Sequence, residues 1–194
     1  MPNGPLTQMA QDKQTVNVLV LELATMVVAI SLAFTATFVA SFDINTVVAY
    51  IFSNVVVIWF WWGYVVDRLS FPPKTMAFPL LDILILIMIS LVPFALKLRE
   101  TYYIASVVGV LIIVWAFLIR LIMSEYRGEL SPQAEGAFSV EVRQRLTIGP
   151  LFVADAALSY FVPAAGLFAF VALTLITVAM NVRPRRQKRV PAVG

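Results

Sequence analysis

The stretch from residue 17 to residue 41 constrains this chain most, because it is long and almost free of charge. Glu22 is the only ionisable side chain among its 25 residues. A helix rises about 1.5 Å per residue, so this run can cross a hydrocarbon core of roughly 30 Å. Small residues form one stripe along it: Ala29, Ala33, Ala36 and Ala40. Such a stripe lets another backbone approach closely, so we predict a membrane helix that packs inside an assembly.

The composition agrees with a membrane protein. Hydrophobic residues make up 61% of the 194 residues and charged residues 13%, against about a quarter in soluble domains. Cysteine and histidine are absent, which excludes disulfides, thiolate chemistry, histidine acid–base catalysis and metal sites built on these ligands. The chain also lacks the Walker glycine loop and the GxSxG motif. We therefore expect neither an enzyme nor a bound cofactor, and no nucleic-acid partner.

Six apolar segments predict an all-α membrane protein with six transmembrane helices. They cover residues 17–41, 46–66, 77–96, 102–123, 147–161 and 164–181. The last two come from one apolar run that would be about 52 Å long as a single helix, and we divide it near Pro163 and Gly166.

Three polar segments flank or connect these helices. Residues 1–16 form a cytoplasmic lead, residues 182–194 a basic cytoplasmic tail, and residues 124–146 a short surface helix with a loop.

The distribution of basic residues predicts the topology. With six helices, both termini and two of the connections share one side of the membrane, and this side holds 12 of the 14 lysines and arginines. Basic residues stay on the cytoplasmic side. Both termini are therefore predicted to be cytoplasmic. The basic tail is expected to contact anionic lipid of the bilayer.

Four ionisable residues interrupt the apolar segments, and we predict that they form one polar cluster in the cytoplasmic half of the membrane. They are Glu22, Asp82, Arg120 and Asp155. Charges at membrane depth are costly, so they pair with one another or line water. A structural cluster in which Arg120 pairs with the acids is the plainer interpretation. The alternative is a cation vestibule or a proton relay.

Several segments resemble the prokaryotic six-helix branch of the transmembrane protein 175 family, the endosomal and lysosomal potassium channels. The third segment, LLDILILIMISLVPFAL, is similar to the third helix of that family. WFWWGYVVDRLSF resembles the end of its second helix, ALSYFVPAAGLF its hairpin between helices five and six, and VVAISLAFT part of its first helix. The family signature Arg-x-x-x-Phe-Ser-Asp is replaced by Leu19, Leu23, Ala24 and Thr25, with Glu22 as the nearest acid.

The resemblance implies a homotetramer in a prokaryotic plasma membrane, with the first helix of each copy lining a central pore. By position, the apolar rings that narrow such a pore would come from Ile30, Phe34 and Thr37. The chain has no TVGYG filter, so the expected mechanism is dehydration of potassium at a hydrophobic constriction.

Two other functions remain open. The departure from the signature is compatible with a non-conducting scaffold or accessory subunit that binds a partner membrane protein. A small proton-coupled transporter would instead use Asp82 and Asp155.

Overall fold

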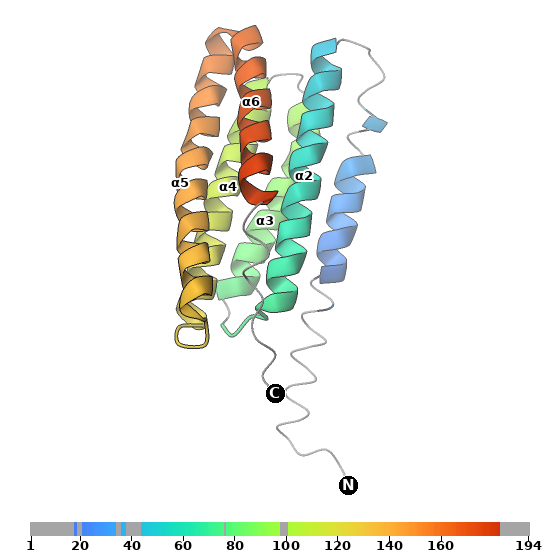
Figure 1. Ribbon diagram of the computed structural model, residues 1–194. Coiled ribbons are helices and arrows are strands. Elements are labelled where there is room, and N and C mark those ends of the chain that lie inside the picture. Colours follow the sequence, from blue (N-terminus) through green and yellow to red (C-terminus); the bar gives the residue numbers. More distant parts are fainter. Residues whose placement is uncertain are drawn as a thin grey trace.

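Helices account for most of the chain that the structure describes. The structure is a computed structural model, and it describes residues 18, 21–33, 36–37, 44–75, 77–97 and 101–182. A first helical segment, Leu21–Ala33, precedes five helices: α2 (Ile44–Ser70), α3 (Ala77–Lys97), α4 (Thr101–Glu125), α5 (Pro132–Phe161) and α6 (Pro163–Val182). Successive helices run in opposite directions in one bundle (Figure 1). The described residues contain no strand, so the all-α class is confirmed.

Three of these helices are long and apolar enough to cross a membrane: Tyr50–Ser70, Thr101–Glu125 and Pro163–Met180. The described residues also contain two shorter apolar helices, Leu21–Ala33 and Ala77–Val92. These segments indicate an integral membrane protein. Six crossings and cytoplasmic termini stay predictions, and both polar ends of the chain, residues 1–16 and 183–194, lie outside the described residues.

The segment between α4 and α5 differs from the sequence prediction. The expected surface helix and loop over residues 124–146 is wrong, because α5 begins at Pro132 and continues without a break to Phe161. Ser131 caps this helix: its side chain accepts a hydrogen bond from the Ala134 backbone N–H at 3.2 Å. Proline at the first helical position fits, because that residue needs no N–H partner.

The division of the last apolar run is confirmed. α5 ends at Phe161 and α6 begins at Pro163. The two helices return tightly on each other, since a Cβ added to Gly166 would lie 2.5 Å from Cα of Ser159. Proline has no backbone N–H to donate to the preceding helical turn, which explains why the break falls at Pro163.

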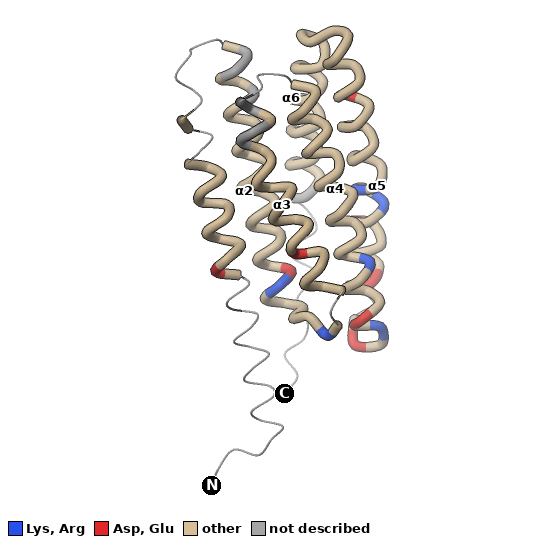
Figure 2. Tube along the Cα trace, turned by 180° about the vertical axis from the view of Figure 1, so that it is seen from behind, with Lys and Arg blue, Asp and Glu red and all other residues tan. Residues whose placement is uncertain are grey.

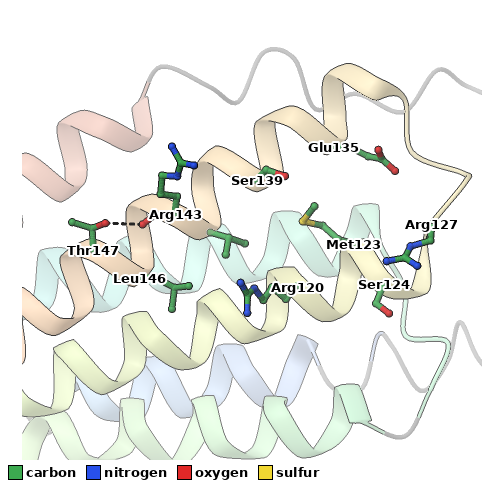
Figure 3. A pocket seen from close by; sticks show the side chains of 10 residues that line it. Arg120, Met123, Ser124, Arg127, Glu135, Ser139, Arg143, Leu146 and Thr147 are labelled. Atoms are coloured by element: carbon green, nitrogen blue, oxygen red, sulfur yellow. Dashed lines mark hydrogen bonds between the residues drawn. The ribbon is translucent and has the colours of Figure 1, made fainter.

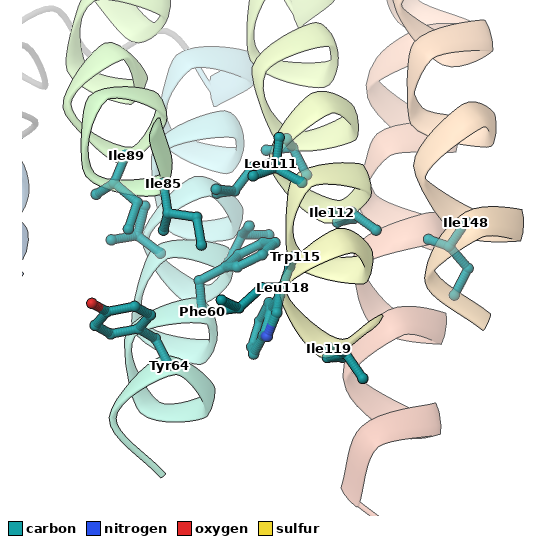
Figure 4. Close-up of a cluster of buried hydrophobic side chains, with 14 of the residues drawn as sticks. Phe60, Tyr64, Ile85, Ile89, Leu111, Ile112, Trp115, Leu118, Ile119 and Ile148 are labelled. Atoms are coloured by element: carbon teal, nitrogen blue, oxygen red, sulfur yellow. The ribbon is translucent and has the colours of Figure 1, made fainter. Parts of the chain in front are cut away.

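α4 lies at the centre of the hydrophobic core. Leu111, Ile112, Trp115, Leu118 and Ile119 of this helix are at most 2% exposed. Figure 4 shows these side chains between α2 and α3 on one side and α5 on the other. Lipid is as apolar as these side chains, so their burial stabilises the bundle through close van der Waals packing, and α4 supplies a large share of that packing.

The connection between α2 and α3 packs onto the start of α5. Phe71 is 2% exposed, and its ring lies 5.3 Å from the rings of both Tyr126 and Phe138. The Tyr126 hydroxyl donates to the Pro72 carbonyl at 2.5 Å. Burial, together with the nearby charge of Glu129, raises the pKa of Tyr126 to about 12, so this hydroxyl keeps its proton near neutral pH.

Charged residues gather at this same end of the bundle (Figure 2). The end of α2, the start of α3, the end of α4 and the start of α5 meet here, joined by hydrogen bonds from Lys74 and Thr75 to Glu125. Such one-sided charge is compatible with the predicted cytoplasmic face, where basic residues accumulate.

α4 and α5 approach each other through two glycines. A Cβ added to Gly109 would lie 2.9 Å from the carbonyl oxygen of Gly149, and one added to Gly149 would lie 2.6 Å from Cγ1 of Ile113. Both distances are shorter than real carbon contacts allow, so only glycine permits this helix spacing.

Alanine at Gly149 is expected to destabilise the protein, because an overpacked core costs about 1–3 kcal/mol. Gly136 provides the control on the same helix, because no atom lies within 4 Å of an added Cβ there. Alanine at that position should raise stability by about 0.5–1 kcal/mol through helix propensity. Thermal unfolding of Gly149→Ala and Gly136→Ala in detergent measures both effects. Equal shifts in the two variants would contradict the close helix approach.

Candidate functional site

One face of the first helical segment packs against the bundle. Ala24, Val28 and Ser31 are at most 5% exposed. Their spacing of four and three residues places them on one side of a helix. Ser31 Oγ donates to the Ile89 carbonyl at 3.3 Å, and Trp61 Nε1 donates to Oγ1 of Thr25 at 3.3 Å. The segment is therefore anchored to α2 and α3 along this side.

The opposite face of the segment is exposed in the single chain. Met26 is 63% exposed and Ile30 is 58% exposed, and Thr37 is exposed farther along. Three members of the predicted packing stripe are exposed as well: Ala29, Ala33 and Ala36. Phe34 and Ala40 lie outside the described residues. The described members of both predicted stripes are thus exposed on the single chain.

Five buried ionisable side chains form a second feature, the buried charge layer. Its members are Asp67, Arg68, Asp82, Glu141 and Arg145, all at most 8% exposed. Arg68 of α2 forms an ion pair with Asp82 of α3. The Arg68 guanidinium also lies 4.9 Å from the centroid of the Phe78 ring. Since removing one partner of a buried pair costs about 3–5 kcal/mol, this contact fixes α2 against α3.

Trp115 of α4 connects the two halves of the buried charge layer. Its indole N–H donates to Asp67 at 3.3 Å, and Cζ of Arg145 lies 3.7 Å from its ring centroid. A guanidinium over the face of a desolvated tryptophan contributes about 2 kcal/mol. Arg145 also pairs with Glu141 one turn away on α5. The layer therefore extends through one tryptophan from α3 to α5.

The predicted polar cluster is not assembled as expected. Asp82 pairs with Arg68, not with Arg120. Arg120 is exposed and lines a cavity between α4 and α5, and Glu22 is exposed at the start of the first segment. One cause of the error is that the segment 46–66 was expected to end before Arg68, whereas α2 continues to Ser70. One additional helical turn brings the guanidinium to Asp82.

Asp155 lies apart from the buried charge layer. It is six residues from the end of α5, whereas Asp82 is five residues from the start of α3. Those two helix ends lie at opposite ends of the bundle (Figure 1). The prediction that Asp155 sits in the same half as Asp82 is therefore wrong. Asp155 is 3% exposed, and neither of its carboxylate oxygens has a hydrogen-bond partner among the described residues. Ser159, one turn further along α5, is buried in the same way.

The sequence interpretation missed Glu141 and Arg145, because it assigned them to a polar connection. A signal for them was present. Phe138, Val142 and Arg145 continue the spacing of the buried face that Ile148 and Phe152 carry further along α5. The Ser131–Pro132 pair marks the beginning of that helix.

No family model, curated protein or solved structure matches this chain. The resemblance to the transmembrane protein 175 family therefore stays a prediction. The described residues also contain no group of three or more acids that could hold a metal ion.

The two buried aspartates should respond differently to asparagine. Asp82→Asn leaves the buried Arg68 without its ion-pair partner, so we expect a loss of about 3–5 kcal/mol. Asp155→Asn removes a buried carboxylate that has no hydrogen-bond donor, so stability should be unchanged or higher. Urea or thermal unfolding in detergent measures both, with Glu129→Gln in the exposed Lys74 pair as the control, expected within about 1 kcal/mol. A similar large loss in both variants would show that Asp155 has a compensating partner.

Proposed function

We propose that this chain is the subunit of an oligomeric membrane channel that passes cations, potassium among them. The exposed face of the first helical segment is the observation that carries this proposal. Ile30 and Thr37 are exposed there beside Ala29, Ala33 and Ala36. Small side chains suit contact with another helix better than contact with lipid, because they let backbones approach. The face is therefore suited to assembly with further copies.

In such an assembly, the Ile30 side chains of the copies form an apolar ring, with Phe34 and Thr37 contributing further rings. An apolar ring excludes water until it widens, and an ion passes only through the wetted state. Glu22 is exposed at the beginning of the same segment, where its charge raises the local cation concentration. Asp82 does not help to attract cations in this way, because the positive charge of Arg68 compensates its negative charge.

The remaining helices would form the frame of the pathway. The buried charge layer and the Gly109–Gly149 approach hold α2 to α5 together, whereas the first segment is anchored along one side only. A peripheral helix on a rigid frame can shift by the small distances that widen an apolar ring.

A non-conducting scaffold is the alternative function. The exposed face would then contact a foreign chain, a possibility that the departure from the family signature favours. A proton-coupled transporter is the weaker candidate, because one of its two proposed acids, Asp82, is held in an ion pair.

Cysteine cross-linking tests the assembly. The chain has no cysteine, so single-cysteine variants need no further background changes. Ile30→Cys in native membranes should give disulfide-linked dimers on mild oxidation, because that face meets another copy. Val28→Cys is the matched control, because Val28 is 5% exposed and faces the bundle. Equal cross-linking of both variants, or none in either, would count against a self-assembled face.

Ion flux tests conduction separately. Ile30→Asn should increase potassium leak from proteoliposomes relative to the wild type, because a polar ring lowers the cost of wetting the constriction. Ile176→Asn serves as the control, because Ile176 is similarly exposed at 50% but lies on α6. Cross-linking at Ile30 without any flux in the Ile30→Asn variant would favour an oligomeric scaffold over a channel.

A further inference from the structure

A cavity of about 730 Å³ lies between the end of α4 and the first half of α5. Figure 3 shows the side chains that line it, which come from these two helices and the turn that connects them. Three are arginines: Arg120, Arg127 and Arg143. Glu135 is the only acid in the lining. Ser124 and Ser139 supply hydroxyl groups, whereas the Thr147 hydroxyl donates to the Arg143 backbone carbonyl at 3.0 Å.

The arginines of this cavity differ from the other basic side chains that the structure describes. Arg68, Lys74 and Arg145 each have a carboxylate oxygen within 4.0 Å. Arg120, Arg127 and Arg143 form no such ion pair with any described residue and are exposed. All three line the same cavity. Among the basic side chains that the structure describes, those without an ion-pair partner are thus gathered in this cavity.

The position of the cavity relative to the membrane narrows the choice of ligand. Arg120 is five residues inside the end of the candidate span Thr101–Glu125, or roughly 7.5 Å along the helix. α5 has 30 residues and is about 45 Å long, so it exceeds a hydrocarbon core of roughly 30 Å by several turns. We place the first part of α5 at the level of the lipid headgroups, because it lines the cavity together with the end of the candidate span Thr101–Glu125.

The remaining lining is suited to the rest of a lipid molecule. Met123, Val142 and Leu146 give the cavity apolar walls beside the charged groups. Guanidinium groups match phosphate oxygens through paired N–H donors, and hydroxyl groups add single hydrogen bonds.

We propose that this cavity binds the phosphate group of an anionic phospholipid. The arginines contact the phosphate oxygens, the hydroxyls of Ser124 and Ser139 contact the headgroup, and the apolar walls contact the start of the acyl chains. A free phosphate ion shares the charged chemistry but gains nothing from the apolar walls. The proposal does not depend on whether the protein conducts ions.

Native mass spectrometry of the detergent-solubilised protein tests the site, with titrations of phosphatidylglycerol, phosphatidylcholine and inorganic phosphate. Wild type should retain phosphatidylglycerol in preference to the other two. The variant Arg120→Gln/Arg143→Gln should weaken its retention at least tenfold, because each charge-assisted hydrogen bond to phosphate contributes about a tenfold change in affinity. Both arginines are exposed and lack ion-pair partners, so their replacement leaves no buried charge uncompensated.

Two control variants separate the cavity from general electrostatic adsorption. Arg185→Gln/Arg186→Gln removes the same charge from the basic tail and should leave retention unchanged. Arg120→Lys/Arg143→Lys keeps the charge but loses the paired donors, so it should weaken retention to an intermediate degree. Equal losses in the tail and cavity variants would overturn the proposal, as would wild-type retention in Arg120→Gln/Arg143→Gln. Inorganic phosphate that binds as tightly as phosphatidylglycerol would overturn the assignment to lipid.

Discussion

The cost of removing charge from water governs how this bundle is built. Arg68, Asp82, Asp67, Glu141 and Arg145 are all buried, and an isolated charge at such depth would cost several kcal/mol. The fold compensates each of them with a carboxylate, a guanidinium or the indole of Trp115. Because these partners come from four different helices, the contacts couple the relative positions of α2, α3, α4 and α5.

Trp115 contacts a charged residue on each of two helices, one through the N–H at the edge of its ring and the other through the ring face. The indole N–H contacts Asp67 on α2, and the ring face contacts Arg145 on α5. A phenylalanine would keep the cation–π contact and lose the donor. The register of α4 is thus set by a polar contact on one side, and by the Gly109–Gly149 approach to α5.

The sequence was sufficient to predict the boundaries of the helices that are apolar throughout. The boundaries expected at residues 77–96 and 102–123 lie within a few residues of α3 and α4, and the break at Pro163 is where the apolar run was divided. The start of α5 was missed because Glu141 and Arg145 made its first half look polar. Hydropathy cannot distinguish a solvated charge from one paired across helices.

The partner of Asp82 could not be predicted for a related reason. The predicted membrane depth of each residue suggested Arg120 as the partner of Asp82. Which residue forms the ion pair, however, depends on which side of each helix faces its neighbour. Arg68 follows Asp67 on the final turns of α2, and only the packing of α2 against α3 brings its guanidinium to the carboxylate. The outward position of Ile30, by contrast, followed from helical spacing once one face of the segment was packed.

Arg143 and Arg145 lie on the same turn of α5, and they show how differently a buried and an exposed guanidinium are compensated. Two residues apart on a helix are separated by about 200°, so Arg145 points to the core and Arg143 to the outside. The inner guanidinium is neutralised by Glu141 and covered by Trp115, because no solvent reaches it. The outer one lines the cavity without an ion-pair partner from the described residues, so it is solvated by water or neutralised by a bound anion. A phosphate held there would join α4 to α5 on the outside, at the level where Trp115 and Arg145 already join them on the inside.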